Sequence, residues 1–122
     1  MVTRNLINRA VQQAQCSNYY QRVGAVIFNK KRIISKGYNQ IRAARHLHNR
    51  FQQWPGSIHA EVASILNAKT NLKGCDIIVV RINKQNQFRL AKPCNYCLMY
   101  LEYVGIRKIY YSIDCYPYIK EL

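Results

Sequence analysis

Acidic residues are scarce in this sequence. Its 122 residues contain five Asp and Glu against nineteen Lys and Arg, which gives a formal net charge of +14. A chain so poor in acids favours chemistry that one carboxylate can perform alone. An excess of positive charge on a small domain creates a field that attracts polyanions and anionic substrates. We therefore expect a nucleic acid or a nucleotide as partner, the alternative being a solvated basic surface without one.

Long apolar runs are also missing. No run approaches the length of a membrane-spanning helix, and residues 1–5 lack the apolar core of a signal peptide. The sequence therefore predicts a soluble, cytoplasmic protein without a membrane partner, in the host cytoplasm if the chain is viral. Hydrophobic residues make up 49% of the chain, which excludes disorder, and the length suits one domain over residues 1–122.

The five cysteines are an odd number and do not suggest a disulfide framework. Cys94 and Cys97 follow Pro93, a residue that suits the first turn of a helix, so both thiols can turn toward one ion. Thiolates together with an imidazole, here His59, favour zinc, and three protein ligands leave the fourth position to water. Glu61, two residues after His59, is expected beside that water rather than on the metal.

A closed, structural zinc site is the alternative. It would recruit Cys75 or Cys115 as a fourth ligand, and it would leave Glu61 without a role. We therefore expect one open, catalytic Zn²⁺ per chain, with a bound water.

Apolar periodicity and turn residues predict the order helix, hairpin, helix, strand, helix, strand. The hairpin turns at residues 29–31, residues 84–88 form a loop, and the stretch 40–58 allows either a short helix or a loop. The last strand should run parallel to its predecessor because a helix connects them. The fold expected is a three-layer α/β/α sandwich around a mixed sheet of about four to five strands. The expected helices are 3–16, 59–69 and 94–104, and the expected strands are 23–28, 32–38, 75–82 and 107–112.

Both metal-bearing segments are expected to begin helices at one edge of the sheet. Helix N-termini stabilise anionic thiolates, so two helix starts that meet can share one ion. In the stretch 40–58, Trp54 is a candidate platform for stacking a base, although a single Trp also suits a core. Arg45 and His46 in the same basic stretch are candidates for contact with phosphate.

Two segments carry a resemblance to the cytidine deaminase superfamily. They are residues 59–68, which contain His59-Ala60-Glu61, and residues 93–97 (Pro-Cys-Asn-Tyr-Cys) together with residues 105–111. The likeness runs from about residue 23 to residue 112 and is strongest to the dCMP-deaminase and tRNA-adenosine-deaminase branch, including small phage-type deaminases. The resemblance implies that residues 1–122 form a single zinc-dependent deaminase domain. It also implies that the chain ends before the fifth strand and last helix of larger relatives.

The resemblance assigns roles to individual residues. Zinc is held by His59, Cys94 and Cys97, and Glu61 moves the protons. Asn39, in the segment Gly37-Tyr38-Asn39, contacts the substrate sugar. The substrate-binding set expected from the resemblance and the stretch 40–58 together is Asn39, Ala60, Trp54, Arg45 and His46.

The reaction implied is hydrolytic conversion of cytosine to uracil, with single-stranded nucleic acid, DNA in particular, as the expected substrate. The first alternative substrate is a free nucleotide such as dCMP, and the second is adenosine in RNA. A catalytically idle zinc domain that binds nucleic acid is the alternative from another class. His59 stands where free-nucleoside cytidine deaminases carry Cys, and Lys92 stands where tRNA-editing relatives carry Glu. Assembly into a homo-oligomer is a further expectation.

Overall fold

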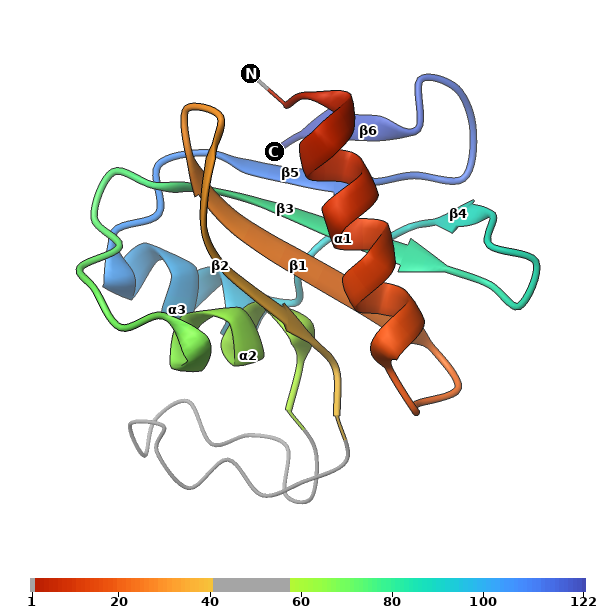
Figure 1. The fold of residues 1–122 in the computed structure, drawn as a ribbon, viewed down its shortest axis with the longest axis horizontal. Helices are drawn as coiled ribbons and strands as arrows, with labels where there is room; N and C mark the ends of the chain where they lie inside the picture. The colour runs from red at the N-terminus through yellow and green to blue at the C-terminus, as the bar shows by residue number, and fades with distance from the viewer. Residues whose placement is uncertain (1, 41–57) are drawn as a thin grey trace.

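In the computed structural model, which describes residues 2–40 and 58–122, one mixed sheet lies between helices on both faces (Figure 1). The strand order is β2-β1-β3-β5-β6, with β4 paired to β3. β3 and β5 are parallel, as the helix between them predicts, and the other strand pairs are antiparallel. The elements are α1 (Arg4–Cys16), β1 (Arg22–Asn29), β2 (Arg32–Tyr38), α2 (Ala60–Asn67), β3 (Asp76–Ile82), β4 (Phe88–Arg89), α3 (Asn95–Val104), β5 (Ile109–Ser112) and β6 (Ile119–Glu121).

The predicted three-layer architecture is confirmed, but the sheet has six strands rather than four to five. The two additional strands are short. β4 lies at the end of the polar stretch predicted to be a loop, where the Asn83 side chain accepts hydrogen bonds from the backbone N–H groups of Gln85 and Gln87 and closes a hairpin. β6 follows the point at which no further strand was expected, and it pairs antiparallel to β5. Strands of two or three residues carry too little periodicity to be predicted from the sequence.

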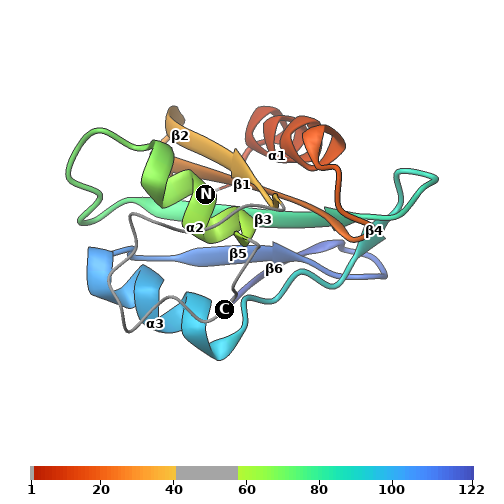
Figure 2. The ribbon, with the colours of Figure 1, turned by 90° about the horizontal axis from the view of Figure 1, so that it is seen from below.

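The sheet buries a separate apolar layer on each face. α1 covers one face, while α2 and α3 cover the other (Figure 2). β3 contributes alternate residues to both layers, which explains its unbroken apolar run. The layer under α1 includes Leu6, Ala10, Ala14, Val26, Phe28, Ile78 and Val80. The opposite layer includes Ala25, Ile27, Val62, Ala63, Ile77, Val79 and Leu101.

Two glycines set how closely the helices approach the hairpin of β1 and β2. A Cβ atom at Gly24 would lie 2.2 Å from the carbonyl oxygen of Ala10 in α1, and one at Gly37 would lie 2.4 Å from the backbone nitrogen of Ser64 in α2. The Ser35 hydroxyl also donates a hydrogen bond of 2.6 Å to the Ser64 carbonyl. α2, whose first turn follows His59, is therefore held directly against β2.

The structure describes the residues on both sides of the gap at 41–57. Gln40 and Ile58 exchange two backbone hydrogen bonds of 2.9 and 2.8 Å. The prediction of a helix or a loop over 40–58 otherwise lies outside the described residues. None of the helices in the described part is long and apolar enough to cross a membrane.

Candidate metal centre and pocket

Two helix starts bring the predicted ligands together. His59 is the N-cap of α2 and Cys94 is the N-cap of α3, and both have extended backbone dihedrals. Neither side chain caps its own helix, so the imidazole and the thiol remain available to the site. Cys97 lies in the first turn of α3. The prediction that both metal-bearing segments begin helices is confirmed.

The three donor groups converge on one point. The Nδ1 atom of His59 lies 3.9 Å from Sγ of Cys94 and 3.4 Å from Sγ of Cys97, and the donor atoms of the three residues lie within 4.8 Å of one another. Across residues 2–40 and 58–122, no other group of His, Cys, Asp or Glu side chains reaches this density. Cys75 and Cys115, the fourth ligands of the structural alternative, are not part of the cluster.

The thiols form an unequal pair. The hydrogen bond from Cys97 is the main cause that lowers the pKa of Cys94 to about 4, and contact with His59 acts in the same direction against burial. Donating to the Cys94 thiolate, together with burial, raises the pKa of Cys97. Burial alone lowers the pKa of His59, but the hydrogen bond with Cys94 and the charges of Glu61 and Cys94 raise it overall. This donor set fits zinc, because a divalent cation deprotonates its coordinating thiols and takes the place of the shared proton.

Glu61 lies beside the metal ligands. Its side chain is 5% exposed, and burial is the main cause that raises the pKa of this carboxyl group, against the lowering effects of its backbone hydrogen bond and the charge of His59. Its side chain also hydrogen-bonds that of Cys97. A buried carboxyl group next to an open metal site can exchange protons with a ligand there.

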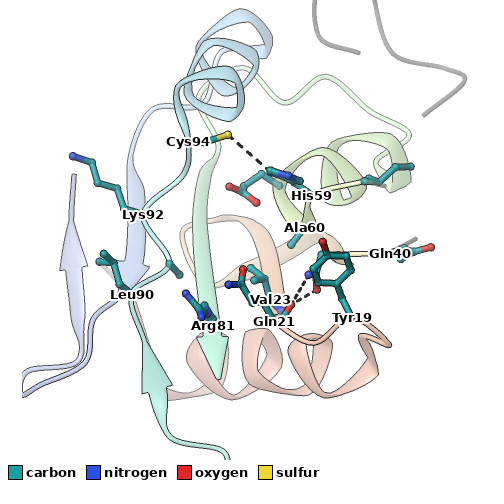
Figure 3. Close-up of a pocket in the computed structure, with 14 residues that line it drawn as sticks. Tyr19, Gln21, Val23, Gln40, His59, Ala60, Arg81, Leu90, Lys92 and Cys94 are labelled. Carbon is teal, nitrogen blue, oxygen red and sulfur yellow. Dashed lines mark hydrogen bonds between the residues drawn. The ribbon is translucent and has the colours of Figure 1, made fainter. Parts of the chain in front are cut away.

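A pocket of about 260 Å³ opens in front of the cluster (Figure 3). Its metal-side wall includes His59, Ala60, Glu61 and Cys94. The remaining lining residues are Tyr19, Gln21, Val23, Asn39, Gln40, Ile58, Arg81, Leu90, Ala91 and Lys92. Glu61 is the single acid among these residues, and Arg81 and Lys92 are the two fixed cations. The pocket therefore suits an anionic substrate whose reacting end reaches a carboxyl group and a metal.

The predicted substrate-binding residues divide into two groups. Asn39 and Ala60 line the pocket. Arg45, His46 and Trp54 lie outside the described residues, so the structure does not place them.

Asn39 also builds the pocket wall. Its Oδ1 atom accepts a 3.0 Å hydrogen bond from the Val23 N–H, and its Nδ2 donates to the Gln21 carbonyl. Its own carbonyl accepts a 2.9 Å bond from the Ser17 hydroxyl. An amide side chain has two N–H donors and two acceptor positions, so one of each remains for a ligand.

Tyr19 and Arg81 are pocket residues that the sequence did not reveal. Val23 and Arg81 lie directly opposite each other in the register of β1 and β3, so both side chains point to the face that carries the metal cluster. Arg81 is the half-buried cation that interrupts the apolar run of β3, and this interruption was the available signal. Tyr19, on the opposite side of the pocket in Figure 3, gave no comparable signal.

The segment that leads into Cys94 is fixed through β5. The Ser112 hydroxyl donates to the Arg89 carbonyl at 2.6 Å and accepts a bond from the Arg81 N–H at 3.0 Å. The Ala91 N–H donates to the Ser112 carbonyl at 3.0 Å. The second half of the metal cluster is thus tied to the centre of the sheet.

These features define an α/β protein with a three-ligand metal centre at the starts of two helices. A family model of the cytidine and deoxycytidylate deaminase zinc-binding region matches residues 2–113. The chain therefore belongs to the cytidine and deoxycytidylate deaminase family, and the prediction of zinc as cofactor, with His59, Cys94 and Cys97 as its candidate site, is confirmed.

The chain is similar to an uncharacterized deaminase encoded in the luxG 3′ region of Aliivibrio fischeri, with 34% identity over 92 residues. This match covers 72% of the chain, which spans 56% of the length of that relative.

Solved structures share the fold. The dCMP deaminase of the cyanophage S-TIM5, in complex with dCMP and dUMP, has a TM-score of 0.64 at 18% identity and covers 94% of this chain and 86% of its own. The cytidine deaminase of Burkholderia pseudomallei has a TM-score of 0.65 at 15% identity and covers 100% of this chain and 92% of its own.

Proposed function

We propose that this protein is a zinc-dependent hydrolase that deaminates cytosine to uracil in single-stranded nucleic acid. The observation that carries the proposal is the meeting of three metal ligands and a buried carboxyl group, Glu61, at the end of one pocket. The named activities of its relatives, which include dCMP and cytidine deaminases, support the reaction class.

The chemistry needs one proton carrier. When bound by His59, Cys94 and Cys97, zinc supplies Lewis acidity that lowers the pKa of water toward neutrality. Glu61 accepts a proton from the attacking water and delivers it to the ring nitrogen beside the amine-bearing carbon. It then carries the second water proton to the amino group, and the carbon–nitrogen bond breaks to release ammonia. Cytosine and water thereby become uracil and ammonia, with the carboxyl group unchanged after the cycle.

In this proposal, backbone N–H groups bind the base and a side-chain amide binds the sugar. Ala60 is the first residue of α2, and the N–H groups in the first turn of a helix lack intrahelical acceptors. They are suited to bind the carbonyl oxygen of a base that sits against Glu61. Asn39 retains a free donor and acceptor for the sugar. Arg45, His46 and Trp54 remain proposed contacts of the same substrate.

Charge supports a polynucleotide substrate over a free nucleotide. Arg81 and Lys92 line the pocket, and nothing in the described part of the chain forms a hydrogen bond or an ion pair with the Arg81 guanidinium. A cation without a partner at a pocket wall suits a phosphate of the substrate. The net charge of +14 exceeds what one phosphate requires, which favours a strand with several phosphates.

Product analysis tests the proposal. The zinc-loaded protein is incubated with dCMP, cytidine, and single- and double-stranded oligonucleotides that contain cytosine or adenine, and uracil or inosine is scored by mass. We expect uracil from the single strand, with a rate that falls steeply as salt rises, because counterions compete with the basic surface.

A mild salt dependence with dCMP as the better substrate would support the free-nucleotide alternative. Inosine would identify adenosine as the target, and binding without ammonia release would identify an idle domain.

We also propose a homo-oligomer. Tyr96, Met99 and Tyr103 recur at three- to four-residue spacing on α3 and are 44%, 43% and 63% exposed, so they form an apolar stripe on one helical face. A mass equal to one chain in light scattering would contradict this.

A further inference from the structure

A stacked pair of tyrosines stands at the mouth of the pocket, in the loop between α1 and β1. The ring centroids of Tyr19 and Tyr20 lie 4.8 Å apart, with an angle of 29° between the ring planes. Tyr19 is half-buried and lines the pocket, as Figure 3 shows, whereas Tyr20 is 80% exposed. The pair therefore continues the pocket wall outward onto the surface.

The loop that carries the pair is well anchored. The Ser17 hydroxyl accepts a 3.1 Å hydrogen bond from the Tyr19 N–H and donates to the Asn39 carbonyl. The side chain of Asn39 in turn binds the backbone of Gln21 and Val23. The rings are thus presented by a backbone tied to the pocket wall, so little ordering is needed when a ligand binds.

An exposed tyrosine ring contributes little to a protein core, but it matches a nucleobase. Bases stack on aromatic side chains whatever their sequence, and such platforms accompany basic channels in proteins that bind single strands. Here the cations Arg81 and Lys92 line the same pocket that Tyr19 enters. Aromatic rings and basic groups therefore adjoin one opening, which fits the alternation of bases and phosphates along a strand.

We propose that Tyr20, backed by Tyr19, stacks on the nucleobase next to the target base in a single strand. The inference rests on the proposed function, because it assumes that the target base occupies the pocket. It assigns the exposed ring to the neighbouring nucleotide, since Tyr20 itself is not among the residues that line the pocket.

Binding measurements test this without turnover. Fluorescence anisotropy of labelled dT₁₀, which has no amine to remove, gives the affinity of the zinc-loaded wild type and of Tyr20→Ala, Tyr20→Phe and Tyr116→Ala. We expect about tenfold weaker binding for Tyr20→Ala, because one stacking contact is lost. Tyr20→Phe should bind as the wild type does, since it keeps the ring. Tyr116→Ala should also bind normally, because Tyr116 is 84% exposed but does not line the pocket.

A strand of ten abasic sites separates stacking from charge. On this strand the wild type and Tyr20→Ala should bind equally, because it offers phosphates without bases. Equal binding of the two proteins to dT₁₀, or the same loss on the abasic strand, would overturn the proposal.

Turnover supplies a second readout. Tyr20→Ala should lower kcat/KM for a cytosine-containing oligonucleotide and leave kcat/KM for dCMP unchanged. An equal loss on dCMP would place Tyr20 on the target nucleotide and overturn the inference. If no substrate is deaminated while the Tyr20 effect on dT₁₀ persists, the proposed function fails and the stacking platform stands.

Discussion

The inner and outer ends of the pocket are built differently. At the inner end, His59, Glu61 and Cys94 come from the starts of α2 and α3, where Glu61 is buried, His59 is half-buried and Cys94 is exposed. At the outer end, Lys92 and the neighbouring Tyr20 are exposed and come from loops, and the half-buried Arg81 comes from β3. The inner end thus carries groups whose positions are fixed by helix starts, while the outer end carries charged and aromatic groups that can contact a larger ligand. We infer that the chemistry resides at one end and the choice of substrate at the other.

Loss of a ligand should have the largest effect. Cys94→Ala removes one of three donors, so we expect the zinc content to fall and activity to reach background. Zinc per chain is measured by atomic emission together with the deamination rate. Cys16→Ala is the matched control, because Cys16 is an exposed free cysteine outside the cluster. Full zinc occupancy in Cys94→Ala would reassign the ligands.

Glu61→Gln tests proton transfer separately from zinc binding at the inner end of the pocket. Gln fills about the same volume but cannot accept and release a proton near neutral pH, so the variant should keep its zinc and lose about 10²- to 10⁴-fold in kcat. The measurement is the rate of ammonia release at confirmed zinc occupancy, with Glu102→Gln, an exposed residue of α3, as the control for the change of charge. A normal rate in Glu61→Gln with zinc in place would exclude Glu61 from the mechanism.

Arg81→Gln tests the outer end, with a smaller expected effect. Loss of one charged hydrogen bond to a phosphate should raise KM about tenfold and change kcat little. Steady-state kinetics on an oligonucleotide measure both constants. Arg9→Gln removes the same charge from the exposed surface of α1 and should leave KM near the wild-type value. A fall in kcat with KM unchanged would indicate that Arg81 takes part in the chemical step, which would contradict the division of roles between the two ends of the pocket.

The inner end could be predicted from the sequence, and the outer end largely could not. His59, Cys94 and Cys97 combine a distinctive donor chemistry with local spacing, and Pro93 marks the start of the helix that presents the thiols. The helices and the long strands follow from apolar periodicity for the same local reason.

Arg81 lines the pocket because of the register between β1 and β3, in which Arg81 faces Val23. A shift of one residue would send its side chain to the other face, and the sequence of one strand does not specify its pairing with another. Tyr19 reaches the pocket because Asn39, the residue after β2, holds its loop. β4 and β6 were not predicted because they form by pairing with a neighbouring strand, and their own sequences are too short to show an alternating pattern.

The contact at Gly37 has a consequence for how the protein tolerates change. At Gly37 the main chain of α2 at Ala63 and Ser64 packs directly against β2, and the N-cap residue of α2 is His59. The separation of peptide backbones does not depend on which apolar residues fill the surrounding layer. Neighbouring core positions can therefore change in size while the imidazole keeps its place, whereas Gly37, which does not line the pocket, has no room for a side chain.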